Sequence, residues 1–211
     1  MSDWRTAQCP PGVSRRILLL RHGETDASSR GRCYGKLDVP LSEEGRQQVE
    51  RAATLLHTLS PDAIVSSPRT RALDSAGIVA KRCQLSVQTE ERFAELDFGD
   101  FEGKRYEDVE REDPDFYTRW MASPTEVSFP NGESYSRMAQ RVVAAYQQRV
   151  QNAASHKVLL VAHGGVNRII LSDVLDLDPA HVFRLEQSYA GISIIDYYDT
   201  TPVLRVMNVL A

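Results

Sequence analysis

Continuous apolar runs and amphipathic segments alternate along the chain. Residues 17–20 and 158–162 are apolar throughout, which is typical of strands with both faces buried. Segments with apolar residues at helical spacing lie between such runs. This order favours an α/β fold, a three-layer αβα sandwich with a mostly parallel mixed sheet and an antiparallel hairpin at one edge. The expected strands are 17–20, 63–65, a short one at Val87, 157–162, 192–198 and 203–209.

Two of the expected helices carry recognisable start signals. Ser42 precedes a helix that runs to about Leu59, and a serine side chain at this place accepts a free backbone N–H. Ser67 and Pro68 are expected to act as the N-cap and the first residue of the next helix. The expected helices are 42–59, 68–82, 133–150 and one through Ile169, Ile170 and Val174.

Residues 97–132 differ in character, and we expect them to form a small, lid-like helical excursion over the C-terminal ends of the strands. They are rich in aromatic and acidic residues without one clean period, and short helices are expected over 105–112 and 115–121. The aromatic residues form either a peripheral hydrophobic cluster or the wall of a substrate lid. Nine carboxylates between Asp97 and Asp115 form either a solvated acidic face or a rim that repels small polyanions.

The chain has 211 residues without repeats or a low-complexity linker, so we expect a single domain over 1–211, with 1–15 flexible. A net charge of −4 argues against nonspecific binding to nucleic acid or anionic membranes. No apolar run is long enough to span a bilayer, and the N-terminal segment lacks the apolar core of a secretion signal. Cys9, Cys33 and Cys83 lack the spacing of metal ligands. We therefore expect a cytoplasmic monomer or homodimer with reduced thiols and no metal site.

The candidate chemistry follows two of the buried strands. Arg21 and His22 come directly after the first strand, and His163 follows 157–162 in the same way, each histidine preceding a glycine. Neighbouring parallel strands bring their C-terminal ends to one edge of a sheet, where sites commonly form. A single Arg-His pair is an ordinary surface feature, but two such junctions predict that both imidazoles share one cleft.

A third junction from strand to helix, residues 66–72, adds positive charge. It contains Arg69 and Arg71, which are two positions apart on the expected helix and therefore do not easily face one pocket together. Spacing alone does not choose between them. The free N–H groups at the helix start also attract anions.

Two imidazoles, two arginines and a helix N-terminus describe a phosphate pocket that needs no metal. Guanidinium groups hold phosphoryl oxygens and stabilise the charge on a transferring phosphoryl group. They also oppose protonation of a nearby imidazole, which can then attack phosphorus and form a phosphohistidine. The leaving alkoxide needs a proton. Glu95 is the carboxylate best placed for this by its pattern, and Asp97 and Glu24 are not excluded.

Four motifs, in this order, resemble those of the histidine phosphatase superfamily, in its phosphoglycerate-mutase-like branch. The resemblance runs from about Ile17 to Val209. The motifs are Arg21-His22-Gly23-Glu24-Thr25, Ser66-Ser67-Pro68-Arg69-Thr70-Arg71-Ala72, Glu95-Leu96-Asp97-Phe98-Gly99-Asp100-Phe101-Glu102-Gly103 and Ala162-His163-Gly164-Gly165.

The resemblance implies a metal-independent phosphomonoesterase without a cofactor, which acts on a small-molecule phosphomonoester through a phosphohistidine. Its motifs select Arg71 over Arg69, and Glu95 over the other carboxylates. The implied roles are His22 as nucleophile, Arg21, Arg71, His163 and Gly164 at the phosphate, and Glu95 as acid and then base.

Two positions depart from the family pattern. Many members have Asn in place of Ser28, at a position that contacts phosphate, and Ser28 keeps a shorter donor. In mutases the residue after the second His-Gly is often Asn or Ser, whereas here it is Gly165. Only the backbone N–H of Gly165 can contribute to the site.

The loop 31–41 bears on the substrate. With Tyr34 and Gly35 as expected substrate contacts, it resembles the corresponding loop of the α-ribazole phosphatases within this family. This resemblance implies α-ribazole 5′-phosphate as the substrate, in cobalamin biosynthesis. A phosphoglycerate mutase and a broad-specificity sugar-phosphate phosphatase are the alternatives. A non-catalytic binding module of the same fold is less favoured, because no core site residue is missing.

Overall fold

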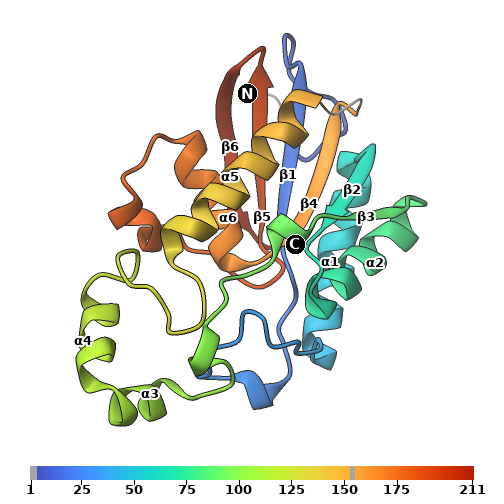
Figure 1. The fold of residues 1–211 in the computed structure, drawn as a ribbon. Helices are drawn as coiled ribbons and strands as arrows, with labels where there is room; N and C mark the ends of the chain where they lie inside the picture. Colours follow the sequence, from blue (N-terminus) through green and yellow to red (C-terminus); the bar gives the residue numbers. More distant parts are fainter. Residues whose placement is uncertain (1–3, 153–154) are drawn as a thin grey trace.

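One six-stranded sheet forms the middle layer of the computed structural model, which describes residues 4–152 and 155–211 (Figure 1). Residues 1–3, part of the stretch expected to be flexible, lie outside the described residues. The strand order is β3-β2-β4-β1-β5-β6. The strands are β1 (Arg15–Arg21), β2 (Ala63–Ser66), β3 (Val87–Thr89), β4 (Lys157–Ala162), β5 (Ile192–Tyr198) and β6 (Thr201–Val209).

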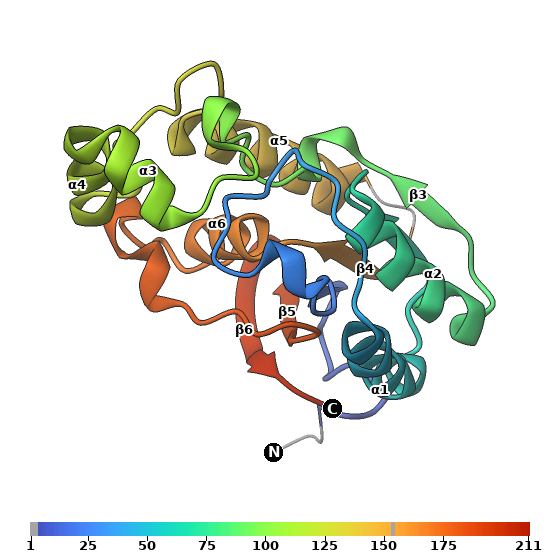
Figure 2. The same cartoon turned by 90° about the horizontal axis from the view of Figure 1, so that it is seen from below.

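The helices lie on both faces of the sheet, which confirms the three-layer αβα prediction (Figure 2). Among the described residues, none of them is long and apolar enough to cross a membrane. The α-helices are α1 (Glu43–Leu59), α2 (Thr70–Cys83), α3 (Tyr106–Glu112), α4 (Pro114–Ala122), α5 (Tyr135–Asn152) and α6 (Gly164–Val174), and short 3-10 helices span Ala27–Ser29, Glu91–Phe93, Gly99–Phe101 and Pro179–Arg184.

The sheet is mostly parallel, as predicted. β1 pairs with β4, β4 with β2 and β2 with β3 in parallel, whereas β5 and β6 add an antiparallel hairpin next to β1. In the central pair Leu20 lies opposite Val161 and Arg21 opposite Ala162. The residues that follow β1 and β4 therefore leave the sheet side by side.

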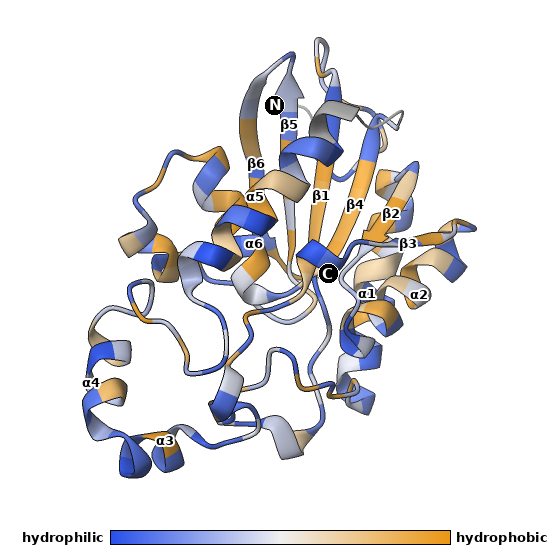
Figure 3. Ribbon diagram, in the orientation of Figure 1, coloured by the Kyte–Doolittle hydropathy of each residue, from blue (hydrophilic) through white to orange (hydrophobic). Residues whose placement is uncertain are grey.

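Successive residues of β1 point to opposite faces of the sheet. Ile17 and Leu19 pack against α5 and α6, whereas Leu18 and Leu20 pack against α1 and α2. All four side chains are fully buried, because a helical layer covers each face. Figure 3 shows β1, β4 and β2 as largely hydrophobic strands, whereas the helices carry both hydrophobic and hydrophilic residues. The uninterrupted apolar run in the sequence is explained by this double burial.

The predicted start of α1 is confirmed, whereas that of α2 is wrong. The Ser42 hydroxyl caps α1 by accepting the N–H of Gly45 at 2.9 Å. α2 begins only at Thr70, and its N-cap residue, Arg69, forms no side-chain capping bond. Ser67 instead extends the sheet, since its N–H donates to the carbonyl of Val161 at 2.9 Å.

The N-terminus of α2 also differs from the expected free anion site. Asp38, from the loop before α1, accepts the Thr70 N–H at 2.9 Å and the Thr70 hydroxyl at 2.5 Å. A carboxylate is the favoured partner for the positive end of a helix dipole. The anion at this helix start therefore belongs to the protein itself.

The excursion that contains α3 and α4 lies beyond the C-terminal ends of the strands, as predicted (Figure 1). Its aromatic rings pack edge to face, with ring centroids 4.9 Å apart for Phe98 and Phe129 and 5.0 Å apart for Phe101 and Phe116. The aromatic residues of the excursion therefore form a peripheral hydrophobic cluster, the first of the two alternatives predicted for them. Its buried members are Cys33, Phe101, Val109, Phe116, Trp120, Val127 and Phe129.

A buried ion pair joins β1 to β5 at the opposite end of the sheet. Asp196 accepts two hydrogen bonds from Arg16, at 2.7 and 2.9 Å, and neither side chain is more than 1% exposed. Arg205 on β6 donates to the same carboxylate at 3.0 Å. Breaking a buried pair is costly because the remaining charge loses its partner inside the protein.

Asp196→Asn is expected to lower the free energy of unfolding by about 3–5 kcal/mol, because it leaves Arg16 buried without a counter-charge. Urea unfolding at neutral pH measures this loss. The control Glu44→Gln breaks an exposed pair with Arg51 and is expected to cost less than about 1 kcal/mol. Equal losses in the two variants would contradict the prediction.

Candidate active site

A cavity of about 370 Å³ lies at the C-terminal ends of the central strands, and Arg21, His22, Tyr34, Arg71 and Glu95 are among the residues that line it. These residues come from four separate stretches of the sequence. Parallel pairing of β1 with β4 brings His163 next to this cavity. The His22 and His163 rings meet edge on with centroids 5.1 Å apart.

The His22 ring is buried and hydrogen-bonded in a way that fixes its tautomer. Its Nδ1 lies 2.7 Å from the carbonyl oxygen of Gly23. A carbonyl oxygen only accepts, so Nδ1 carries the proton and Nε2 keeps its lone pair. Burial, followed by the charges of Arg21 and Arg71, holds the pKa of His22 well below its usual value. The neutral ring is the form that can attack phosphorus.

His163 is fully buried and is held by Ser67. Its Nε2 lies 2.6 Å from the Ser67 hydroxyl, and its Nδ1 has no hydrogen-bond partner within the described ranges. Burial, followed by the charge of Arg71, holds the pKa of His163 well below its usual value. Ser67 is a site residue that the sequence analysis assigned to a helix cap. Its place at the end of β2, next to β4, is the signal that would have found it.

Arg71 occupies the cavity, and Arg69 is absent from its lining. The Arg71 guanidinium donates to the carbonyls of Gly35 at 2.9 Å and Leu37 at 3.1 Å. Gly35 itself does not line the cavity, so it touches the site through Arg71. A side chain at Gly35 is excluded, because its Cβ would lie 1.5 Å from the carbonyl oxygen of Leu96.

Arg21 lies between a backbone carbonyl and an aromatic ring. It donates to the Gln187 carbonyl at 2.5 Å, and its guanidinium carbon stands 4.0 Å from the ring centroid of Tyr189. The Tyr189 hydroxyl lies 2.9 Å from that of Tyr34. Tyr189 was missed by the sequence reasoning. It precedes β5, whose antiparallel pairing with β1 brings it to His22, where the Ala190 N–H donates to the His22 carbonyl at 3.1 Å.

Glu95 is the only one of the three candidate carboxylates that lines the cavity. One oxygen accepts the Leu96 N–H and the other the Gly165 N–H at the start of α6, both at 3.0 Å. Asp97 accepts the Gly99 N–H instead, and Glu24 pairs with Arg30. The backbone contribution expected of Gly165 is thus directed to Glu95. A Cβ at Gly165 would lie 2.3 Å from that carboxylate and displace it.

Glu95 also lines a second cavity, of about 630 Å³. Arg21 lines both cavities, whereas Gly164 lines only this one. Arg168, one helical turn after Gly164, adds a guanidinium that the sequence reasoning missed. Four aromatic residues of the excursion contribute to its wall, so the peripheral cluster also lines this cavity: Phe98, Tyr106, Tyr117 and Trp120.

The acidic rim, one of the two alternatives for the carboxylates of the excursion, does not line either cavity. None of the nine carboxylates between Asp97 and Asp115 lines them. Six of them are engaged in local contacts. Asp97, Asp113 and Glu102 accept backbone N–H groups, and Asp100 accepts from the amide of Asn131. Asp108 pairs with Arg111, and Glu112 pairs with Lys104. Arginines supply the charge around the two cavities instead: Arg21, Arg30, Arg32, Arg71 and Arg168.

Ser28 lies apart from the other predicted site residues. It is exposed, its N–H donates to Asp26 at 2.9 Å, and it lines neither cavity. Its neighbours Ser29 and Arg30 do line the smaller cavity. A phosphate contact from Ser28 therefore stays a prediction.

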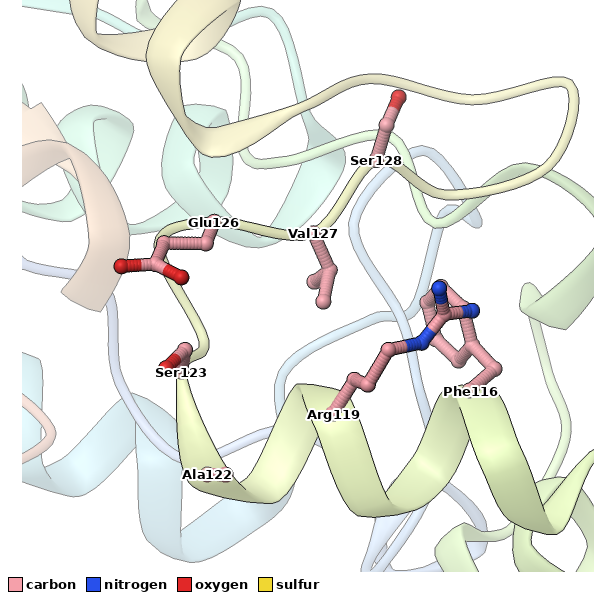
Figure 4. A pocket seen from close by; sticks show the side chains of 7 residues that line it. All are labelled: Phe116, Arg119, Ala122, Ser123, Glu126, Val127 and Ser128. Carbon is pink, nitrogen blue, oxygen red and sulfur yellow. The ribbon is translucent and has the colours of Figure 1, made fainter.

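A third cavity, of about 450 Å³, lies between α4 and residues 123–128 (Figure 4). Its lining includes Phe116, Arg119, Glu126 and Val127, and none of the predicted site residues. No histidine is among its lining residues, so this cavity lacks the imidazole that the predicted chemistry needs.

Three known proteins resemble this chain over most of its length. The chain is 33% identical over 199 residues to a bifunctional protein of Mycobacterium tuberculosis, covering 93% of this chain and 54% of that protein, so it spans about half the length of that relative. It is 30% identical over 193 residues to the adenosylcobalamin/alpha-ribazole phosphatase of Escherichia coli, covering 92% and 95%. The crystal structure of the alpha-ribazole phosphatase from Shigella flexneri superposes with a TM-score of 0.85 at 29% identity, covering 92% and 96%.

A family model covers the stretch that holds the site. Residues 17–210 match the model described as the histidine phosphatase superfamily, branch 1. The match includes Arg21, His22, Arg71, Glu95 and His163. The chain therefore belongs to the histidine phosphatase superfamily.

Proposed function

We propose that the protein is a metal-independent phosphomonoesterase that transfers a phosphoryl group first to His22 and then to water. One observation carries this proposal. The neutral His22 ring, whose Nε2 keeps its lone pair, lines one cavity together with Arg21 and Arg71. Such groups bind a phosphate dianion and stabilise charge on its oxygens while the nucleophile attacks.

In the first step Nε2 of His22 attacks phosphorus, and the bond from phosphorus to the leaving oxygen breaks. Glu95, protonated, gives its proton to that oxygen. The Nδ1–H bond to Gly23 stabilises the positive ring of the phosphohistidine. In the second step water attacks phosphorus, Glu95 takes the water's proton, and the N–P bond breaks to restore neutral His22. His163, Gly164 and Ser28 are the further phosphate contacts in this proposal.

The position of Glu95 supports its role as the acid. It lines both the cavity that holds His22 and the aromatic cavity beside it. A leaving group in the aromatic cavity would have its bridging oxygen at this border, next to the carboxylate. Two hydrogen bonds from backbone N–H groups hold the carboxylate there.

We propose α-ribazole 5′-phosphate as the substrate. The loop 31–41 supports this choice by resemblance, and two relatives are named as alpha-ribazole phosphatases. The aromatic wall of the 630 Å³ cavity suits a leaving group with an aromatic base. Arg168 in the same cavity favours an alternative, a phosphomonoester with an anionic leaving group such as phosphoglycerate, because its charge attracts a second anion.

His22→Ala is expected to abolish turnover and the covalent intermediate, because it removes the nucleophile. Brief mixing with ³²P-labelled substrate should label the unaltered protein with an acid-labile, alkali-stable phosphate, and leave the variant unlabelled. The control His57→Ala alters an exposed histidine of α1 and should keep full activity. EDTA should leave turnover unchanged, because the proposed charges at phosphorus are guanidinium groups. A fully active His22→Ala protein would refute the mechanism.

Glu95→Gln is expected to slow the hydrolysis of alkyl phosphates about 10²–10⁴-fold and that of 4-nitrophenyl phosphate much less. The reason is that only the alkoxide of an alkyl phosphate, a poor leaving group, needs a proton from a strong acid. The ratio of the two kcat/KM values measures this difference. Asp97→Asn is the matched control, since Asp97 is nearby and lines neither cavity. Equal slowing of both esters would assign the acid to another group.

Among α-ribazole 5′-phosphate, 3-phosphoglycerate, fructose 2,6-bisphosphate and phosphoserine, the first is expected to have the highest kcat/KM. Phe183, which is 53% exposed at the edge of the aromatic cavity, supplies a matched variant. Phe183→Ala should reduce the stabilisation of the transition state for α-ribazole 5′-phosphate by about 0.5–1.5 kcal/mol. The kcat/KM for 3-phosphoglycerate should stay unchanged. A preference for 3-phosphoglycerate, or its conversion to 2-phosphoglycerate, would favour the alternative.

A further inference from the structure

The carboxylate of Glu102 collects backbone N–H groups from two separate loops. One oxygen accepts from Lys36 at 2.8 Å and Phe98 at 3.0 Å, the other accepts from Leu37 at 2.9 Å, and both lie 3.1 Å from the Gly35 nitrogen. A carboxylate has enough lone pairs for these donors. Its charge also makes each bond stronger than a bond between neutral groups.

The loop 35–37 holds Arg71 with its other backbone groups. The carbonyls of Gly35 and Leu37 accept from the Arg71 guanidinium at 2.9 and 3.1 Å. Each of these two residues thus donates its N–H to Glu102 and offers its carbonyl to Arg71. A movement of the loop away from Glu102 would move both acceptors of the guanidinium.

The fourth donor, Phe98, connects the same carboxylate to the substrate cavities. Phe98 lines both the cavity with His22 and the aromatic cavity. The loop 35–37 and the start of the excursion are therefore both hydrogen-bonded to the side chain of Glu102. The backbone at Gly35 also lies close to the carbonyl of Leu96, directly before the excursion, and leaves no room there for a side chain.

We propose that Glu102 is a positioning residue that sets the place of Arg71 in the phosphate pocket by fixing the loop 35–37. It acts through Arg71 and does not touch the substrate. The same bond network keeps Phe98 in register with the phosphate pocket. The inference rests on the proposed function for one point only, that Arg71 binds the phosphoryl group.

Glu102→Ala tests this role through phosphate binding. The dissociation constant of inorganic phosphate, measured by calorimetry without turnover, is expected to rise about tenfold. kcat/KM should fall by a similar factor for phenyl phosphate and for α-ribazole 5′-phosphate, because both use the same phosphate pocket. The control Glu112→Ala removes another carboxylate of the excursion, which pairs with Lys104, and should leave phosphate affinity unchanged.

The result also separates two ways in which Glu102 can act. Unchanged affinity for phosphate in Glu102→Ala, with a loss confined to α-ribazole 5′-phosphate, would overturn the proposal and assign Glu102 to the wall at Phe98. A protein that binds phosphate but hydrolyses none of the esters would refute the proposed function and leave the binding test of Glu102 intact.

A double-mutant cycle identifies Arg71 as the group through which Glu102 acts. In an Arg71→Ala background, Glu102→Ala is expected to change kcat/KM for phenyl phosphate by less than about twofold, because the coupled partner is already gone. The same fold loss in both backgrounds would overturn the proposal. If Glu102→Ala does not fold, Glu102→Gln replaces it in both tests, since its NH₂ group cannot accept from the loop. The outcomes that support or overturn the proposal are the same for Glu102→Gln as for Glu102→Ala.

Discussion

The parallel pairing of β1 with β4 is the constraint on which the site depends. It continues past the end of β1, where the His22 N–H donates to the Ala162 carbonyl at 3.0 Å. A slip by one residue would turn every side chain to the opposite face. Each face of β1 packs its own set of fully buried leucine and isoleucine side chains under a helical layer, so such a slip would disrupt two cores at once. The distance between the two imidazoles is therefore fixed by apolar packing away from the chemistry.

Arg16 in the core and the arginines of the site are held by different groups, and this difference explains the charge of the site. Arg16, in the core, is neutralised by a carboxylate at 2.7 Å. Arg21 and Arg71 are held by backbone carbonyls instead. A carbonyl orients a guanidinium without cancelling its charge. The positive charge of both groups therefore remains available to an anion, and together with burial it keeps the neighbouring imidazoles neutral.

Much of the fold and the core of the site follow from local patterns. The strands at 17–20 and 157–162 and the hairpin were predicted, because each has its own apolar run. Both short helices of the excursion were also predicted, although that stretch has no clean period. The two histidine junctions were also found, since each directly follows such a strand. The predictions failed where a partner from a distant part of the chain decides. Ser67 looks like a helix cap until β4 places His163 beside it, and Tyr189 has no local signal at all.

The acidic residues of the excursion also have partners that the sequence pattern does not reveal, and this affects which leaving groups the site is expected to accept. Composition counts their charges, but the structure assigns most of them to caps, ion pairs and the backbone of loop 35–37. A charge that is engaged in this way contributes little to repulsion at a cavity it does not line. In the proposed function, the choice of leaving group therefore depends on two features of the aromatic cavity, its rings and the guanidinium of Arg168. Rings favour an aromatic body and the guanidinium favours an anion, so the order of preference between such substrates is set by the balance of these two groups.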